Sequence, residues 1–100
     1  MKILQVVPRA DCEVSLKAQL KAKERQLRKG PTAFRRKTEG KWAHVKYPGW
    51  IRWDETIGGI VVAEVNTRVV ESEWQLLQAF IGYLYRHLGD DIDTITITYR

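Results

Sequence analysis

Cationic and aromatic side chains are interleaved between Arg35 and Trp53, and this segment carries the most evident chemistry of the chain. Lys and Arg bind the phosphates of a nucleic acid, and aromatic rings stack on its unpaired bases. Each stacked base is worth about 1–3 kcal/mol, so two well-placed rings would matter. The segment therefore predicts contact with RNA or single-stranded DNA. The alternative is structural, because Trp and Tyr also favour β-strands and pack across hairpins.

Residues 41–47, Lys-Trp-Ala-His-Val-Lys-Tyr, form the central part of this segment. They resemble the aromatic-alternating strand motif of RNA-recognition sheets. Three differences stand out: the internal glycine of that motif is missing, His44 stands at an aromatic position, and an additional strand follows before the second predicted helix. The resemblance implies contact between this strand and a nucleic acid, without making the chain a member of that family.

The net charge of +5 is concentrated in the first half of the chain. Residues 1–46 carry 13 Lys and Arg against 4 Asp and Glu, a net charge of +9, whereas residues 47–100 carry 4 against 8, a net charge of −4. Such asymmetry suits a polyanion, although a merely solvated surface would have the same composition. The predicted phosphate ligands are Lys17, Lys21, Arg25, Arg28, Arg35, Arg36 and Lys37. The predicted stacking or base-edge contacts are Trp42, His44 and Trp50.

No sequence pattern predicts catalysis, a metal site or a cofactor. Acidic residues flank Cys12 on both sides and oppose thiolate formation, so we expect an inert thiol. The two histidines, His44 and His87, lack the spacing of zinc ligands. The Gly58-Gly59 pair precedes a predicted strand, whereas phosphate-binding glycine loops precede helices. We therefore expect a binding domain rather than an enzyme.

Hydrophobic periodicity predicts two helices. The first, residues 11–29, would begin at Asp11 as its N-cap and end at a Gly-Pro pair. The second, residues 72–88, has a capping-box pattern in Ser72 and Gln75 and a glycine after its last residue. Its apolar arc is broader than that of an ordinary surface helix, so it must pack against more than a sheet.

The remaining periodic segments predict five strands, with a turn at Glu39-Gly40. These strands are residues 2–7, 34–38, 41–47, 60–66 and 93–99. Residues 50–53 either resume the extended chain or fold back over the sheet. The order β-α-β-β-β-α-β predicts one α+β domain, residues 1–100. We expect a two-layer sandwich in a ferredoxin-like arrangement, with a mainly antiparallel sheet and both helices on one face.

Period-two alternation predicts which side chains face away from the helices. Polar Gln5 and Glu64 mark this outward phase in the apolar strands, and on the hairpin it would include Trp42, His44 and Lys46. A large exposed apolar surface usually marks an interface. The alternative function is therefore a small homodimeric interaction module or a ligand-binding module. Its predicted interface is Ile3, Val7, Ile60, Val62, Trp74, Leu76, Phe80 and Tyr83.

The apolar runs of the chain are short. None approaches the roughly 18 residues that a membrane span requires, and the apolar stretch near the N-terminus is too short for a signal peptide. One cysteine excludes an internal disulfide framework. We therefore expect a cytoplasmic protein without a membrane partner, whose candidate partners are a nucleic acid and a second copy of itself.

Overall fold

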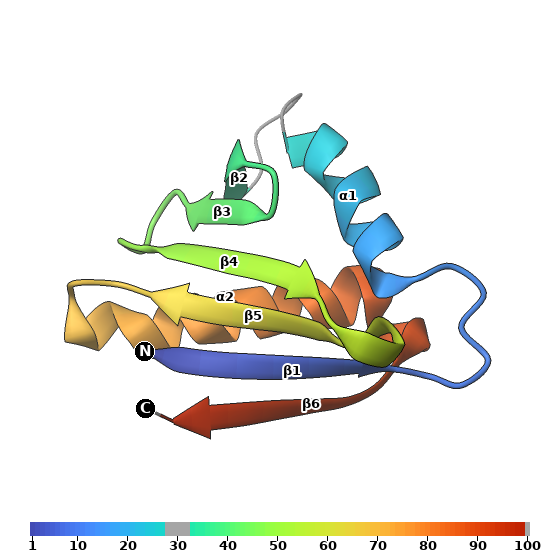
Figure 1. Ribbon diagram of the computed structural model, residues 1–100. Coiled ribbons are helices and arrows are strands. Elements are labelled where there is room, and N and C mark those ends of the chain that lie inside the picture. The colour runs from blue at the N-terminus through green and yellow to red at the C-terminus, as the bar shows by residue number, and fades with distance from the viewer. Residues whose placement is uncertain (28–32, 100) are drawn as a thin grey trace.

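The computed structural model describes residues 1–27 and 33–99. Within them the chain forms an α+β fold with a six-stranded antiparallel sheet and two α-helices (Figure 1). The elements are β1 (Lys2–Pro8), α1 (Leu16–Leu27), β2 (Phe34–Thr38), β3 (Lys41–His44), β4 (Trp50–Glu55), β5 (Val61–Asn66), α2 (Val70–Leu88) and β6 (Ile92–Tyr99). Short 3₁₀ turns, Ile57–Gly59 and Gly89–Asp91, precede β5 and β6.

The strands lie in the order β2-β3-β4-β5-β1-β6 across the sheet. The apolar strands β1 and β5 are interior and β6 is an edge. The expected number of strands between the helices was wrong, because residues 50–55 form β4 and raise it from three to four. The sheet order therefore differs from the four-stranded ferredoxin-like order.

Both helices pack against the same face of the sheet. Trp42 of β3 contacts both of them: its Nε1 donates a hydrogen bond to Glu24 of α1, and its ring lies 5.9 Å from that of Phe80 in α2. In Figure 1, α2 runs behind the sheet and α1 lies beside the β2–β3 hairpin. The opposite face of the sheet carries neither helix, so its side chains are available to a partner.

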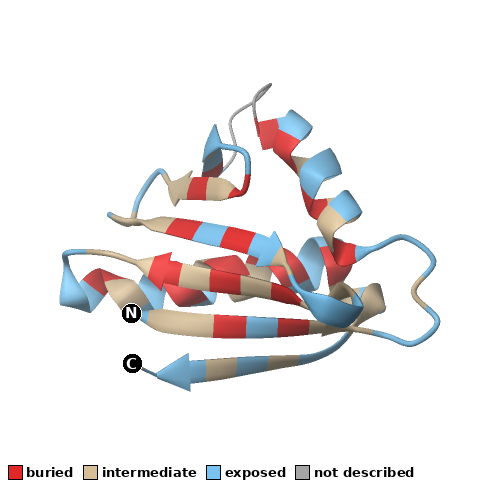
Figure 2. Ribbon diagram, viewed as in Figure 1, coloured by how far each residue is buried: buried red, intermediate tan, exposed pale blue. Residues whose placement is uncertain are grey.

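Alternation along the interior strands separates the core from this open face (Figure 2). On β1 the side chains of Leu4 and Val6 are buried while Gln5 between them is exposed. On β5 the buried residues are Val61, Ala63 and Val65. The helices complete the core with Leu16, Leu20 and Leu27 of α1 and Leu76, Leu77, Phe80 and Leu84 of α2. Burial of this apolar surface is the main term that stabilises the two layers.

The two helices begin at other residues than predicted. α1 begins at Leu16 rather than near Asp11, because the Ser15 hydroxyl accepts a hydrogen bond from the Ala18 N–H at 3.1 Å and caps the helix there. α2 begins at Val70, so Ser72 lies inside its first turn and is buried instead of capping it. The predicted capping box is therefore wrong.

Gly40 makes the tight β2–β3 turn possible. Its φ of +74° lies in the left-handed region, which favours glycine. A Cβ there would lie 2.8 Å from the carbonyl oxygen of Trp53. The Gly40 carbonyl also accepts a hydrogen bond from the Trp53 N–H at 2.8 Å, so the turn is fastened to β4. This contact fixes how the hairpin joins the rest of the sheet.

Candidate nucleic-acid interface

The side chains of the β2–β3 hairpin face the opposite way from the prediction. Trp42 was expected on the open face, but it is fully buried, with its ring 5.3 Å from that of Tyr83 and edge-on to it. Arg36 lies opposite Trp42 in the register, and His44 is two residues along the same strand, so both belong to the helix-covered face. A buried ring cannot stack on a base, so the structure removes Trp42 as a stacking contact.

A buried carboxylate explains this orientation. Glu24 of α1 is only 5% exposed, and its Oε1 accepts hydrogen bonds from Trp42 Nε1 at 2.8 Å and from the Gly40 N–H at 2.9 Å. Its Oε2 lies 3.3 Å from Arg36 Nε in an ion pair. The indole N–H thus has a partner in the core, which lets the ring be buried without an unsatisfied donor. Arg36 is tied to the same carboxylate and is a poor phosphate ligand.

His44 packs at the outer end of the hairpin rather than on the open face. Its ring stacks on Tyr47 at 4.7 Å between centroids and meets the edge of Phe34 at 5.0 Å. Its Nδ1 accepts a hydrogen bond from the Lys46 N–H at 3.0 Å. Burial, with a smaller contribution from the charge of Lys46, lowers the pKa of His44. The neutral imidazole is therefore the form that the fold favours.

This lowered pKa predicts a loss of stability in mild acid. Because the unfolded chain binds a proton near the ordinary pKa of about 6.5 and the folded chain resists it, stability is complete above that pH and falls below it. His87 has a pKa lowered by burial and by Lys23 and Arg86, so it adds to the effect. Urea unfolding at pH 7.5 and pH 5.5 should show a smaller pH dependence in His44→Gln than in the wild type. An unchanged dependence would exclude this role for His44.

The cations of α1 are engaged with acidic residues of the sheet. Lys21 Nζ lies 2.8 Å from Glu39 in the β2–β3 turn, and Lys17 Nζ lies 3.6 Å from Asp54 in β4. The hydrogen bond between Lys21 and Glu39 raises the pKa of the lysine and lowers that of the glutamate. Arg25 is exposed, and the predicted phosphate ligand Arg28 lies outside the described residues. An open hollow of about 450 Å³ separates α1 from the turn and β4.

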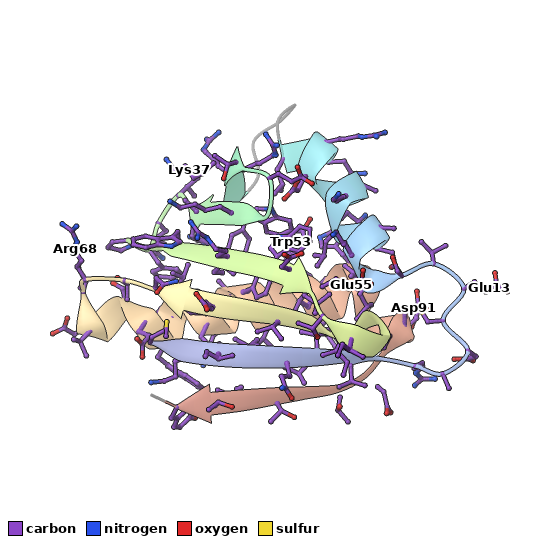
Figure 3. The ribbon with its side chains drawn as sticks, viewed as in Figure 1. Glu13, Lys37, Trp53, Glu55, Arg68 and Asp91 are labelled. Carbon is purple, nitrogen blue, oxygen red and sulfur yellow. The ribbon has the colours of Figure 1, made fainter. Side chains whose placement is uncertain are left out.

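A second group of cations lies on the open face of the sheet. The three cations Arg35, Lys41 and Arg52, together with the ring of Trp50, form what we name the basic sheet patch. Lys41 and Arg52 are directly opposite each other across β3 and β4, and the Lys41 Nζ lies 4.9 Å from the centroid of the Trp50 ring. Trp50 is partly exposed, and Arg35 and Arg52 are exposed. Lys37 is exposed beside this patch on β2 (Figure 3).

Two members of the basic sheet patch, Lys41 and Arg52, were missed by the sequence prediction. The signal was present on β4, where alternation of Ile51 and Trp53 into the core places Trp50 and Arg52 together on the other face. Lys41 precedes Trp42 on β3, so its side chain must lie on the open face once Trp42 is placed in the core. Lys17, Lys21, Arg25 and Arg28 were favoured instead because they recur at helical spacing in the sequence.

The charges are also unevenly spread along the strand direction. Glu13, Glu55 and Asp91 lie toward one end of the molecule, whereas Arg68 lies at the other (Figure 3). Two acidic residues adjoin the basic sheet patch: Glu64 of β5 lies opposite Arg52, and exposed Asp54 follows Arg52 by two residues on β4. The positive charge of the open face is therefore concentrated over β2, β3 and β4.

The residues of the predicted dimer or ligand interface do not form one surface. Leu76 and Phe80 have no exposed surface and Tyr83 is 8% exposed, because α2 buries them against the sheet. Burial raises the pKa of Tyr83 to about 12. Ile3, Val7, Ile60 and Val62 are half-buried on the open face, and Trp74 is 48% exposed on α2. The three buried side chains cannot contact a partner in the folded chain.

Cys12 lies in the segment before α1. Its Sγ donates a hydrogen bond to the Val14 carbonyl at 2.8 Å. Partial burial and the charge of Asp91 raise the pKa of this thiol, which disfavours the reactive thiolate. Within residues 1–27 and 33–99, no three His, Cys, Asp or Glu side chains are grouped so that they could hold a metal ion.

No family model, curated protein or solved structure matches this chain. In the part of the chain that the structure describes, neither helix combines the length and apolar character needed to cross a membrane. The chemistry of its surfaces is therefore the basis on which its function can be inferred.

Proposed function

We propose that this protein is a small non-enzymatic domain that binds RNA or single-stranded DNA through the basic sheet patch. The observation that carries the proposal is the direct opposition of Lys41 and Arg52 beside the partly exposed Trp50 on a sheet face without helices. Like charges directly opposite each other on neighbouring strands destabilise a sheet. Glu64 faces Arg52 from β5, and a bound phosphate would supply a counter-charge on the side of Lys41.

The patch combines the two kinds of contact that single-stranded nucleic acids use. Arg35, Lys41 and Arg52 would bind phosphates, and the ring of Trp50 would stack on a base. Neighbouring strands are about 4.8 Å apart, so cations on β2, β3 and β4 can follow successive phosphates of an extended strand. No side chain of the patch reads a particular base, so we expect affinity with little sequence preference.

The cations of α1 have a smaller role in this proposal. Lys17 is paired with Asp54 and Lys21 with Glu39. A phosphate that binds either lysine would first have to break that ion pair. Arg25 and Lys37, which are exposed, can add attraction at longer range.

We also propose that β6, β1, β5 and β4 correspond to the strands of a ferredoxin-like sheet, with the β2–β3 hairpin added beside β4.

A titration with fluorescently labelled oligonucleotides tests the function. We expect binding to single-stranded RNA or DNA that weakens steeply as salt rises, because counterions are released when cations bind phosphates. Three patch cations would give a slope of about −2 in a plot of log affinity against log salt concentration, from about −0.7 per phosphate contact. A duplex of the same sequence should bind more weakly, because its bases cannot reach Trp50. Absence of binding at low salt would refute the proposal.

A further inference from the structure

The outer edge of β6 is free of any partner among the described residues. β6 is last in the strand order and pairs only with β1, where Gln5 lies opposite Thr96. Its eight residues make it the longest strand of the sheet, and Figure 1 shows nothing beyond it. The backbone N–H and C=O groups of such an edge form a template on which another strand can pair.

The two edges of the sheet differ in their protection against a second copy. The edge strand β2 has three consecutive cations, Arg35, Arg36 and Lys37, which would repel the same strand of another copy. β6 has the sequence Ile-Asp-Thr-Ile-Thr-Ile-Thr-Tyr, with Asp93 as its one charged residue and no proline. Long, β-prone and nearly uncharged, it lacks the features that keep edge strands apart.

Apolar side chains adjoin the β6 edge on the helix-covered side. Ile95 and Ile97 are only partly buried there, and Tyr99 is 66% exposed. Each residue of an α-helix is rotated by about 100° from the one before it. This rotation places Trp74 and Ile81 on the side of α2 opposite Tyr83. Because Tyr83 contacts Trp42 toward the β2 edge, these two side chains face toward β6.

We infer that β6 pairs antiparallel with β6 of a second copy, so that two sheets join into one continuous sheet. Antiparallel pairing about a two-fold axis is self-complementary. On the open face Thr94, Thr96 and Thr98 would meet the same threonines, and on the helix-covered face the isoleucines would meet. The Asp93 side chains would lie at opposite ends of the paired segment.

The charge distribution favours a second copy as the occupant of this edge. The basic sheet patch and the β2–β3 hairpin lie at the far edge from β6. Pairing through β6 therefore keeps the two cationic regions as far apart as the sheet allows, despite the net charge of +5 on each copy. The inference does not depend on nucleic-acid binding, because none of the residues involved belongs to the basic sheet patch.

Sedimentation of the wild type, Thr96→Lys and Gln5→Lys tests the inference. The wild type should be a dimer, and Thr96→Lys should weaken it at least about tenfold, because two lysines would face each other near the two-fold axis. Gln5→Lys is the matched control: it adds the same charge to the same face, one strand further from the interface, and should dimerise as the wild type does. Circular dichroism establishes that both variants fold.

Each other outcome counts against β6 pairing. A wild type that stays monomeric would overturn it, and so would a dimer that both variants leave unchanged or weaken equally. If Thr96→Lys fails to fold, hydrogen exchange of the wild type decides: alternate amides of β6 should exchange more slowly as protein concentration rises. Exchange independent of concentration would overturn the pairing.

Discussion

Replacing Glu24 with leucine is expected to lower the free energy of unfolding by about 3 kcal/mol, since it leaves buried polar groups without a partner. The Trp42 indole and the Gly40 N–H would both lose their acceptor, and Arg36 would lose its counter-charge. Leucine has a bulk similar to that of glutamate and leaves little cavity, so the loss of unfolding free energy reports mainly the lost hydrogen bonds and ion pair. Urea denaturation gives the value directly.

Two controls separate the buried carboxylate from a general effect of losing an acid. Glu13→Leu removes an exposed acid and should change the free energy of unfolding by less than about 0.5 kcal/mol. Glu24→Gln keeps an oxygen that can accept from the indole, so it should lose less stability than Glu24→Leu. Equal stability of Glu24→Leu and the wild type would mean that this carboxylate does not hold the hairpin.

The same substitution connects stability to the candidate interface. Glu24 fixes the β2–β3 hairpin on α1, and that hairpin carries Arg35 and Lys41 of the basic sheet patch. When the hairpin loses its attachment, these cations lose their fixed positions relative to Arg52. The core contact on one face of the sheet thus determines the arrangement of charges on the other.

The faces of the longer strands could be predicted from sequence because single polar residues mark their phase. Gln5 on β1 and Glu64 on β5 occupy the open face, as predicted, and the isoleucines of β6 face the helices. The hairpin could not be predicted in this way. Its phase depends on a hydrogen bond between Trp42 and Glu24, which is distant in sequence and outside any strand pattern.

A clue to that hydrogen bond was nevertheless present in the first helix. Glu24 lies four residues after Leu20 and three before Leu27, so it occupies the same face as the leucines that pack into the core. An acid at such a position needs a buried donor, and the indole of Trp42 can supply one. The start of α1 was harder to predict because both Asp11 and Ser15 offer a capping oxygen, and α2 begins after Val69 without a side-chain cap.

Trp50→Ala is expected to weaken binding of single-stranded RNA by about 1–3 kcal/mol, or roughly 5- to 150-fold, because it removes one stacking platform. Stability should change little by comparison, since the Trp50 ring lies on the open face and is partly exposed. Tyr85→Ala is the matched control: it removes an aromatic ring that is 78% exposed on α2, on the other side of the sheet, and should leave affinity unchanged.

Substituting a cation of the basic sheet patch should change the salt dependence of binding, whereas substituting its aromatic ring should not. Lys41→Ala removes one phosphate contact, so the salt dependence of log affinity should become shallower by about 0.7, whereas Trp50→Ala should leave that slope unchanged. Lys17→Ala serves as the comparison, because its charge is already shared with Asp54 and a smaller change is expected. If Lys17→Ala lowered affinity and salt dependence more than Lys41→Ala did, the nucleic acid would lie along α1 and the open face of the sheet would not be the binding surface.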